Sequence, residues 1–198
     1  MISLIAMLPL FFSSFAGVCK AETAPPAKQS DSAKTMSKEI VITLTKMPDG
    51  VTGILSTIYI DATPIQVWKV LTDYNNLKRY IPRMVESDLV EDKGNLKVIG
   101  LTGEFKLLLF KKTLKLAINM HETFPIKIDY EKISGDFEVY RGVWTLQKQP
   151  SKGTLLTYEC EIKPSFFAPD FIFQSTLKKD IVEGMRALRT EAERMPAD

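Results

Sequence analysis

Apolar and polar residues alternate along the middle of the chain, from Val85 to Lys163. A period of two gives a β-strand one dry face and one wet face. The apolar members of the successive strands are Val98 to Leu101; Leu114, Leu116, Ile118 and Met120; Ile126, Ile128 and Tyr130; Tyr140, Trp144 and Leu146; and Leu156, Tyr158, Cys160 and Ile162. Turn residues interrupt the pattern at 92–95, 124–125, 134–136 and 150–153. Because such short connections join antiparallel neighbours, the pattern predicts a meander of five or six strands.

After Pro164 the apolar period changes to 3.6 residues, which is typical of an amphipathic helix. The apolar positions are Leu177, Ile181, Met185, Leu188 and Ala192, and charged residues occupy most of the opposite arc. The helix is predicted to begin near Ala168 or Pro169 and to end at about Met195. At 1.5 Å per residue it measures roughly 35 to 40 Å, so it is long enough to lie across a whole sheet.

Shorter elements are predicted before the meander. The segment from Lys38 to Ile60 has the pattern of a β-hairpin around the turn at 47–50. Thr63 followed by Pro64 is a helix start signal, and a short helix is expected to about Thr72. A further helical turn is expected at 77–81. Two short helices are therefore expected after the first strands.

The N-terminal segment differs from the rest of the chain. Residues 1–18 are almost wholly apolar and are followed by Cys19-Lys20-Ala21, a small-residue ending that suits signal peptidase. The interpretation favoured here is a signal peptide at residues 1–21. A retained membrane anchor is the alternative, although the run is interrupted by Pro9 and falls short of the roughly 20 residues that span a bilayer. Lipidation of Cys19 is disfavoured, because Val18 stands where a small residue is expected.

Composition sets the limits of the folded part. Residues 22–36 are rich in Ala, Pro, Ser, Lys and Thr, which predicts a flexible linker. The domain is predicted at residues 37–195, a size that suits one core. Without residues 1–21 the chain has 25 basic and 24 acidic residues, so its near-neutral charge excludes a nucleic-acid partner. Only Cys160 would remain after cleavage, so no internal disulfide is expected in a periplasmic or secreted protein.

Local sequence motifs add a resemblance. The stretch Ile60 to Tyr74 contains Ala-x-x-x-x-Val-Trp and then Asp-Tyr, and a helical turn with Pro82 follows it. Gly142-x-Trp144 and the closing Pro164 continue the match. These residues resemble the polyketide cyclase/dehydrase and coenzyme-Q-binding families of the START-like superfamily. The resemblance spans about residues 37–195 and implies an α+β helix-grip fold, in which a curved antiparallel sheet wraps around a long C-terminal helix.

The resemblance also implies a cavity between the concave sheet face and the C-terminal helix. A cavity lined by apolar groups stays dry until an apolar ligand occupies it. The alternative is that large side chains fill the space. The predicted ligand-binding residues are Trp68, Tyr140, Trp144, Leu146, Tyr158, Phe167, Phe171, Leu177 and Ile181. Aromatic walls with a few hydroxyl groups suit mostly apolar ligands, and core packing is an equally good explanation of the same residues.

The residues that could carry catalysis are few. His121 is the only histidine and falls on the wet face of its strand, away from Cys160, so neither a metal site nor a serine hydrolase site is expected. Asp73 and Tyr74 are explained better by a turn after the short helix than by catalysis. No catalytic residue, metal or cofactor is therefore predicted.

Four Phe and one Ile lie within residues 164–173, where the last strand meets the long helix. This segment is either a plug that packs inward or a pocket rim that touches a membrane, and residues 107–112 raise the same question. The sequence favours an exported binder or carrier of a hydrophobic small molecule such as a lipid, quinone or polyketide-like compound. The alternative is a cyclase or dehydrase-type enzyme that uses the same cavity.

Overall fold

The computed structural model describes residues 39–107 and 110–196. The described residues belong to one compact unit. The predicted signal peptide and linker lie outside the described residues. No helix within the described ranges has the length and apolar character needed to cross a membrane.

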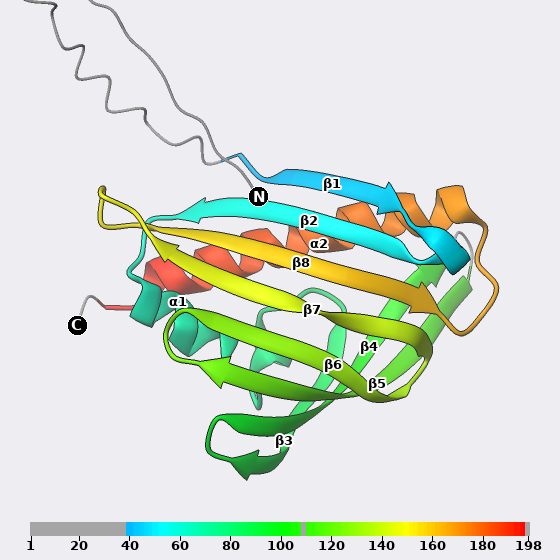
Figure 1. Cartoon of the computed structure of the whole chain (residues 1–198), viewed down its shortest axis with the longest axis horizontal. Coiled ribbons are helices and arrows are strands. Elements are labelled where there is room, and N and C mark those ends of the chain that lie inside the picture. The colour runs from blue at the N-terminus through cyan, green and yellow to red at the C-terminus, as the bar shows by residue number, and fades with distance from the viewer. Residues whose placement is uncertain (1–38, 108–109, 197–198) are drawn as a thin grey trace, which may run out of the picture. The chain divides into compact units, whose positions relative to one another are not determined.

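Eight strands form one antiparallel sheet in the order β1-β2-β8-β7-β6-β5-β4-β3. The strands are β1 (Val41–Lys46), β2 (Thr52–Ile60), β3 (Met84–Lys93), β4 (Leu96–Leu107), β5 (Phe110–Thr123), β6 (Lys127–Gly135), β7 (Phe137–Lys148) and β8 (Thr154–Pro164). The helical elements are η1 (Pro48–Gly50), α1 (Pro64–Leu71), η2 (Leu77–Arg79) and α2 (Asp170–Arg194). The sheet curves around α2, as Figure 1 shows, and the helix-grip prediction is confirmed.

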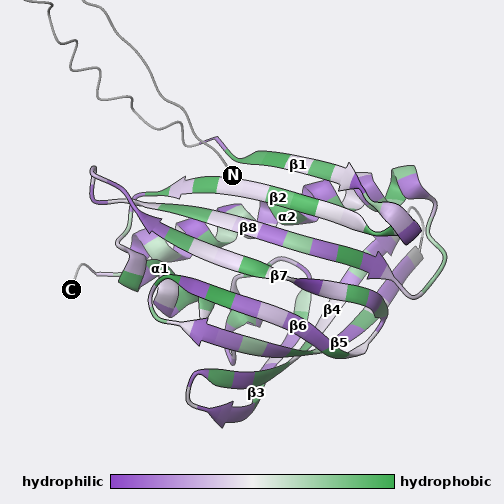
Figure 2. Cartoon of the chain, in the orientation of Figure 1, coloured by the Kyte–Doolittle hydropathy of each residue, from purple (hydrophilic) through white to green (hydrophobic). Residues whose placement is uncertain are grey.

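Hydropathy alternates along the strands (Figure 2), which gives the sheet one apolar face. The largest fully buried side chains are Ile58, Ile60, Ile99, Ile128, Leu156 and Met185, which come from four strands and α2. The core therefore lies between the concave face and the helix. The predicted hairpin, meander and long helix are all present.

Two details of the sequence prediction needed correction. The second short helix is a single 3₁₀ turn at η2, because the backbone of Asn76 already bonds to Asp73 and no regular helix leads into it. The break between β4 and β5 was missed. Residues 107–110 are apolar and contain no Gly, Pro, Asn or Asp, so the usual turn signal is absent there.

Helix α1 is fixed at its start. The Thr63 side chain accepts a hydrogen bond from the Gln66 backbone, and the Gln66 side chain accepts one from the Thr63 backbone, which forms a capping box. The Gln66 amide also donates to the carbonyl oxygens of Met195 and Pro196, at 2.9 and 3.1 Å. One buried amide thus joins the start of α1 to the end of α2.

Candidate functional site

A partly enclosed cavity of about 300 Å³ lies between the inner face of the sheet and α2. From α2 it is lined by Leu177, Asp180, Ile181, Gly184, Met185 and Leu188. The sheet contributes Met84, Ile99, Leu101, Ile118, Met120, Tyr130, Tyr140, Trp144, Tyr158 and Ile162, and the segment before β3 contributes Leu71, Tyr74, Leu77, Ile81 and Pro82. A mostly apolar cavity with a few polar groups is the usual form of a small-molecule site.

Aromatic rings cover the part of the sheet wall formed by β6, β7 and β8. Trp144 lies opposite Tyr158 in the strand register, and their ring centroids are 4.2 Å apart. The rings of Tyr130 and Tyr158 are nearly parallel, at 10° and 6.3 Å, and the Tyr140 ring is 5.4 Å from that of Tyr130. This aromatic wall, defined as Tyr130, Tyr140, Trp144 and Tyr158, therefore presents flat faces together with three hydroxyl groups.

Gly142 makes room for the aromatic wall. A β-carbon at this position would lie 2.0 Å from the Glu159 carbonyl oxygen and 2.5 Å from the Tyr130 hydroxyl. Because the β-carbon is absent, the Tyr130 hydroxyl reaches across and donates a hydrogen bond to that carbonyl oxygen at 3.3 Å. Any other residue at position 142 would displace Tyr130 or separate β7 from β8.

Burial keeps the hydroxyl groups of this wall protonated. It raises the pKa of Tyr130, Tyr140 and Tyr158 above the usual range of a phenol. It also raises the pKa of the neighbouring Cys160 thiol to about 11. At neutral pH these groups are uncharged, so they can form hydrogen bonds with a ligand but cannot act as anionic nucleophiles.

The helix wall carries one carboxyl group. The Asp180 Oδ1 atom lies 2.5 Å from an Arg83 guanidinium nitrogen, and the same nitrogen donates to a Glu183 carboxylate oxygen at 2.7 Å. Burial raises the pKa of Asp180 to about 6, against the opposing effect of the Arg83 charge. Asp180 Oδ1 is buried and makes no hydrogen bond of acceptable geometry with the described residues. The ion pair joins α2 to the loop before β3 at the edge of the cavity.

That loop, residues 80–84, forms the third wall. Arg83 adopts a left-handed backbone conformation with φ of 63°, and its carbonyl oxygen accepts a hydrogen bond from Glu104. The Tyr80 hydroxyl donates to the Val70 carbonyl oxygen at 2.6 Å. Because Ile81, Pro82 and Met84 line the cavity on either side of Arg83, the ion pair with α2 holds these side chains over the ligand space.

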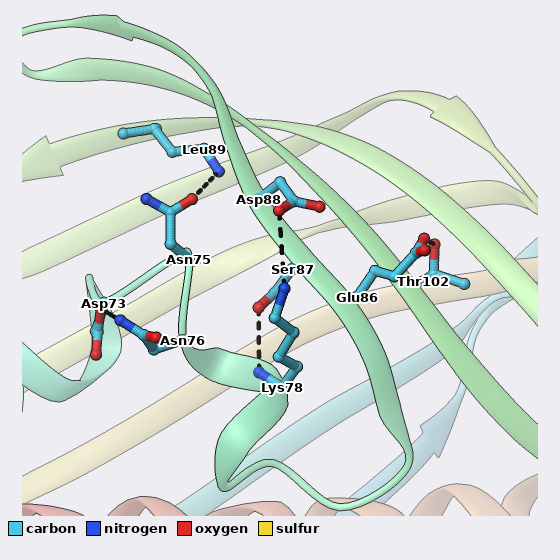
Figure 3. A network of polar contacts seen from close by, with 9 residues as sticks. All are labelled: Asp73, Asn75, Asn76, Lys78, Glu86, Ser87, Asp88, Leu89 and Thr102. Atoms are coloured by element: carbon cyan, nitrogen blue, oxygen red, sulfur yellow. Dashed lines mark hydrogen bonds and ion pairs between the residues drawn. The ribbon is translucent and has the colours of Figure 1, made fainter.

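The segment before the loop is fixed to strand β3 by polar contacts, which Figure 3 shows. The Asn75 side chain accepts a hydrogen bond from the Leu89 backbone at 2.9 Å, and the buried Ser87 hydroxyl accepts one from the Lys78 backbone at 3.1 Å. These bonds cover the free edge of β3, the last strand of the sheet. These bonds connect the segment to β3, whereas the ion pair of Arg83 connects the loop to α2.

Gly184 occupies the interior of α2, where glycine costs about 1 kcal/mol relative to alanine. No atom lies within 4 Å of the place that its β-carbon would take, so close packing does not explain this glycine. The position lines the cavity. The missing side chain therefore leaves volume that a ligand can occupy.

The structure separates the nine predicted ligand residues into three groups. Tyr140, Trp144, Tyr158, Leu177 and Ile181 line the cavity. Trp68 and Leu146 are buried elsewhere in the core, and Trp68 packs edge-on against Phe124 at 5.4 Å. Phe167 and Phe171 are exposed at 89% and 74% and do not line the cavity. They precede or open α2, and its buried face begins only at Phe173. Ligand binding by the five lining residues stays a prediction.

Several cavity residues were not predicted. Tyr130 carried a recognisable signal, because it shares the alternation of Ile126 and Ile128. Asp180 and Gly184 lie beside the apolar positions of α2. A polar or small residue on the apolar face of a helix indicates a place where that face is not filled by apolar side chains. Arg83 gave no local signal, because its partners are about 100 residues away in the chain.

Other features of the described residues do not form a comparable site. His121 is exposed and contacts Asn95, as its strand face predicted, and the described residues contain no group of three potential metal ligands. A larger hollow of about 720 Å³ lies on the outer sheet face. It is lined by charged residues that include Asp129, Glu131 and Arg141, and it is more open to solvent than the inner cavity. The inner cavity is thus the better candidate for an apolar ligand.

Residues 60–189 match the family model described as "Polyketide cyclase / dehydrase and lipid transport". The chain belongs to this family. The match covers the cavity-lining segments and most of α2. The START-like resemblance inferred from Ile60 to Tyr74 and from Gly142-x-Trp144 is confirmed. A comparison with curated protein sequences gave no match.

Solved structures share this fold at low sequence identity. The Zhui aromatase/cyclase from Streptomyces sp. R1128 has 16% identity and a TM-score of 0.62, covering 73% of this chain and 94% of its own. The STAR-related lipid transfer protein from Xanthomonas axonopodis has 16% identity and a TM-score of 0.58, covering 77% and 99%. Human StAR-related lipid transfer protein 5 has 8% identity and a TM-score of 0.62, covering 80% and 84%. At these identities the likeness establishes the fold alone.

The raised pKa of Asp180 predicts a pH dependence of stability. Its pKa is about 6 in the folded protein and near 3.8 in an unfolded chain, so the stabilising contribution of the protonated group is complete below pH 3.8. This contribution is lost as the pH rises through 6. The Asp180→Asn variant is therefore expected to lose less unfolding free energy than wild type between pH 4 and pH 7.5, measured by urea denaturation. Asp88→Asn, which removes an exposed carboxylate, is the control. Equal losses in wild type and Asp180→Asn would contradict the prediction.

Proposed function

We propose that the protein is an exported binder or carrier of a hydrophobic small molecule, which it holds in the cavity beneath α2. The observation that carries the proposal is the cavity itself, about 300 Å³ of space with a predominantly apolar lining. Membership of a family described by both cyclase/dehydrase activity and lipid transport supports it. The alternative from the sequence, an interior filled by large side chains, does not fit this volume.

The cavity volume favours a compact ligand. A water molecule takes about 30 Å³ of the liquid, so the cavity has room for about ten groups of that size. It also stands at the lower end of the roughly 300 to 1,000 Å³ typical of small-molecule sites. One long acyl chain would already fill it, and a two-chain lipid would require α2 and the loop at 80–84 to separate. A ring system or a short chain fits without such movement.

A cyclase or dehydrase-type enzyme is the second candidate. Such chemistry requires groups that accept and donate protons at working pH. Asp180 is the cavity-lining group whose pKa lies near neutrality, and it is held by Arg83. Burial raises the pKa of the phenols of the aromatic wall, so at neutral pH they are weak proton donors and cannot serve as the base. A binder or carrier is therefore favoured.

Filling the cavity provides the decisive test. In Gly184→Leu, the new β-carbon would have no neighbour within 4 Å, and leucine favours a helix over glycine. The variant is expected to remain at least as stable as wild type and to lose its ligand. Purified proteins would be extracted into organic solvent without detergent, and the extracts compared by mass spectrometry.

Arg186→Leu is the matched control for this experiment, because it adds leucine at an exposed position two residues along the same helix. A hydrophobic compound should be recovered from wild type and from this control in similar amounts, and at least about tenfold less from Gly184→Leu. Recovery in equal amounts from all three proteins, or from none, would argue against the cavity as a carrier site.

Export is the part of the proposal that rests on the sequence of residues 1–21. An apolar segment followed by Cys19-Lys20-Ala21 suits removal by signal peptidase and delivery to the periplasm or the medium. The mature chain is expected to begin near Glu22. Intact mass and N-terminal sequencing of protein from a periplasmic fraction would check this, and a full-length chain in the membrane fraction would support a retained anchor instead.

Transient contact with a membrane would allow an apolar ligand to enter and leave. Phe167 and Phe171 point into solvent at the start of α2, and Lys112 lies 4.1 Å from the ring of the adjacent Phe166. Exposed aromatic residues next to lysine suit a surface of anionic lipid headgroups. Lys46 and Lys163 line the small hollow beside Phe167, where Lys46 pairs with Asp170 and Lys163 with Glu138.

The double variant Phe167→Ser and Phe171→Ser is expected to bind anionic phosphatidylglycerol vesicles about tenfold more weakly than wild type, because it loses two exposed apolar rings. Co-sedimentation at low and high salt would measure the effect. Val90→Ser removes an exposed apolar residue on β3 and is the control. Membrane contact at this end would be disproved by equal sedimentation of wild type and the double variant.

A further inference from the structure

The two edges of the sheet differ in how they are protected. Strand β3 ends the sheet on one side, and its pairing with β4 contains two bulges. Five of its ten residues are charged, and the Asn75 side chain accepts a hydrogen bond from the Leu89 backbone. Bulges, charges and covering side chains are the usual means by which proteins keep an edge strand from pairing with another chain. The β3 edge is therefore closed to a further strand.

Strand β1 ends the sheet on the other side and largely lacks these protections (Figure 1). Its six residues pair with β2 in continuous register and include no proline. Its one charged residue is Lys46 at the end of the strand, which pairs with Asp170 at 2.6 Å. Beyond the β1–β2 ladder, no backbone hydrogen bond within the described ranges reaches residues 41–46. An uninterrupted edge of this kind is a template for another strand.

One side-chain hydrogen bond shows which backbone groups lie on this free edge. The Ser56 hydroxyl of β2 donates to the Val41 carbonyl oxygen at 3.1 Å, so this carbonyl group faces β2. In an antiparallel ladder, successive residues turn their N–H and C=O groups to opposite sides of the strand. The backbone groups of Val41 and Thr43 therefore face β2, and those of Ile42 and Leu44 face outward. The free edge offers N–H donors and C=O acceptors at these two positions.

We propose that β1 is a dimerisation edge, at which a second copy of this chain adds its own β1 in antiparallel pairing centred on Thr43. The second copy fits because the strand is self-complementary about this residue. Ile42 meets Leu44 of the second copy on the partly buried face, and Val41 meets Thr45 of the second copy on the exposed face. No two charged residues oppose each other within the paired segment. The interface is separate from the cavity, so the inference goes beyond the proposed function.

Other centres of pairing fit this edge less well. A centre at Ile42 would pair only residues 41–43 of each β1, and a centre at Leu44 would place Lys46 opposite Ile42. The centre at Thr43 pairs residues 41–45 and lets Ile42 and Leu44 form about four hydrogen bonds across the edge. Because this contact is small, we expect a reversible dimer with a Kd on the order of 10 µM.

The association can be tested by changing the charge at the centre of the pairing. Sedimentation velocity of the purified protein from about 1 to 300 µM would follow the dimer by mass action. Thr43→Lys places two ammonium groups opposite each other and is expected to weaken the dimer at least about tenfold, as is Thr43→Glu with two carboxylates. An equimolar mixture of the two variants is expected to restore the dimer, because opposite charges then meet. Leu55→Lys, an exposed position opposite Thr43 on β2, is the control and should leave association unchanged.

Thr43→Cys gives a second measurement that does not depend on an added charge. Thr43 and its copy form a close pair without backbone hydrogen bonds, in which the Cα atoms lie about 4.5 Å apart. A disulfide spans Cα separations of about 4.4 to 6.8 Å, so mild oxidation should link two copies of this variant. Leu55→Cys should not be linked, and oxidised wild type, in which Cys160 is buried, gives the background.

Three results would overturn the proposal. The first is a wild type that stays monomeric up to about 300 µM. The second is a dimer that persists in both Thr43→Lys and Thr43→Glu, and the third is a Thr43→Cys protein that oxidation does not link. If the charged variants fail to fold, the cysteine variant decides alone. None of these results affects the carrier function, because the extraction experiment with Gly184→Leu tests the cavity independently.

Discussion

The packing of α2 against the concave face of the sheet is the interaction on which the rest of this structure depends. It buries residues from most strands, and Gln66 fixes the end of α2 to the start of α1. Helix and sheet make contact along their length but do not fill the space between them, since Gly184 has no neighbour where a side chain would stand. The same interaction therefore produces both the hydrophobic core and the cavity.

The polar groups of the cavity are organised by two local departures from regular structure. Gly142 leaves the room between β7 and β8 that lets Tyr130 reach the Glu159 carbonyl oxygen. Arg83, in a left-handed conformation that costs roughly 1 to 2 kcal/mol, directs its side chain to Asp180 on α2. Gly142 thus shapes the aromatic wall, and Arg83 holds the loop at 80–84 over the cavity.

The strands and α2 could be predicted because the apolar period of each element survives along its whole length. The cavity residues on those elements, such as Tyr158 and Ile181, followed from the same periodicity and from the family resemblance. The exposure of Phe167 and Phe171 could not be predicted, because aromatic character does not indicate direction at a junction between elements. Arg83 and Asp180 could not be paired, because their contact joins residues about 100 positions apart and depends on the backbone turn before β3.

These departures have a common physical explanation. Glycine in a helix interior, a left-handed arginine and a carboxyl group under partial burial each make the folded state less stable, and protein cores usually exclude all three. Here they surround one space, and each either leaves volume or places a charge or a hydrogen-bond donor beside it. A sequence selected for stability alone would close this cavity with a larger residue at 184 and an apolar one at 180. Their presence at the same cavity is best explained by selection for a molecule that occupies it.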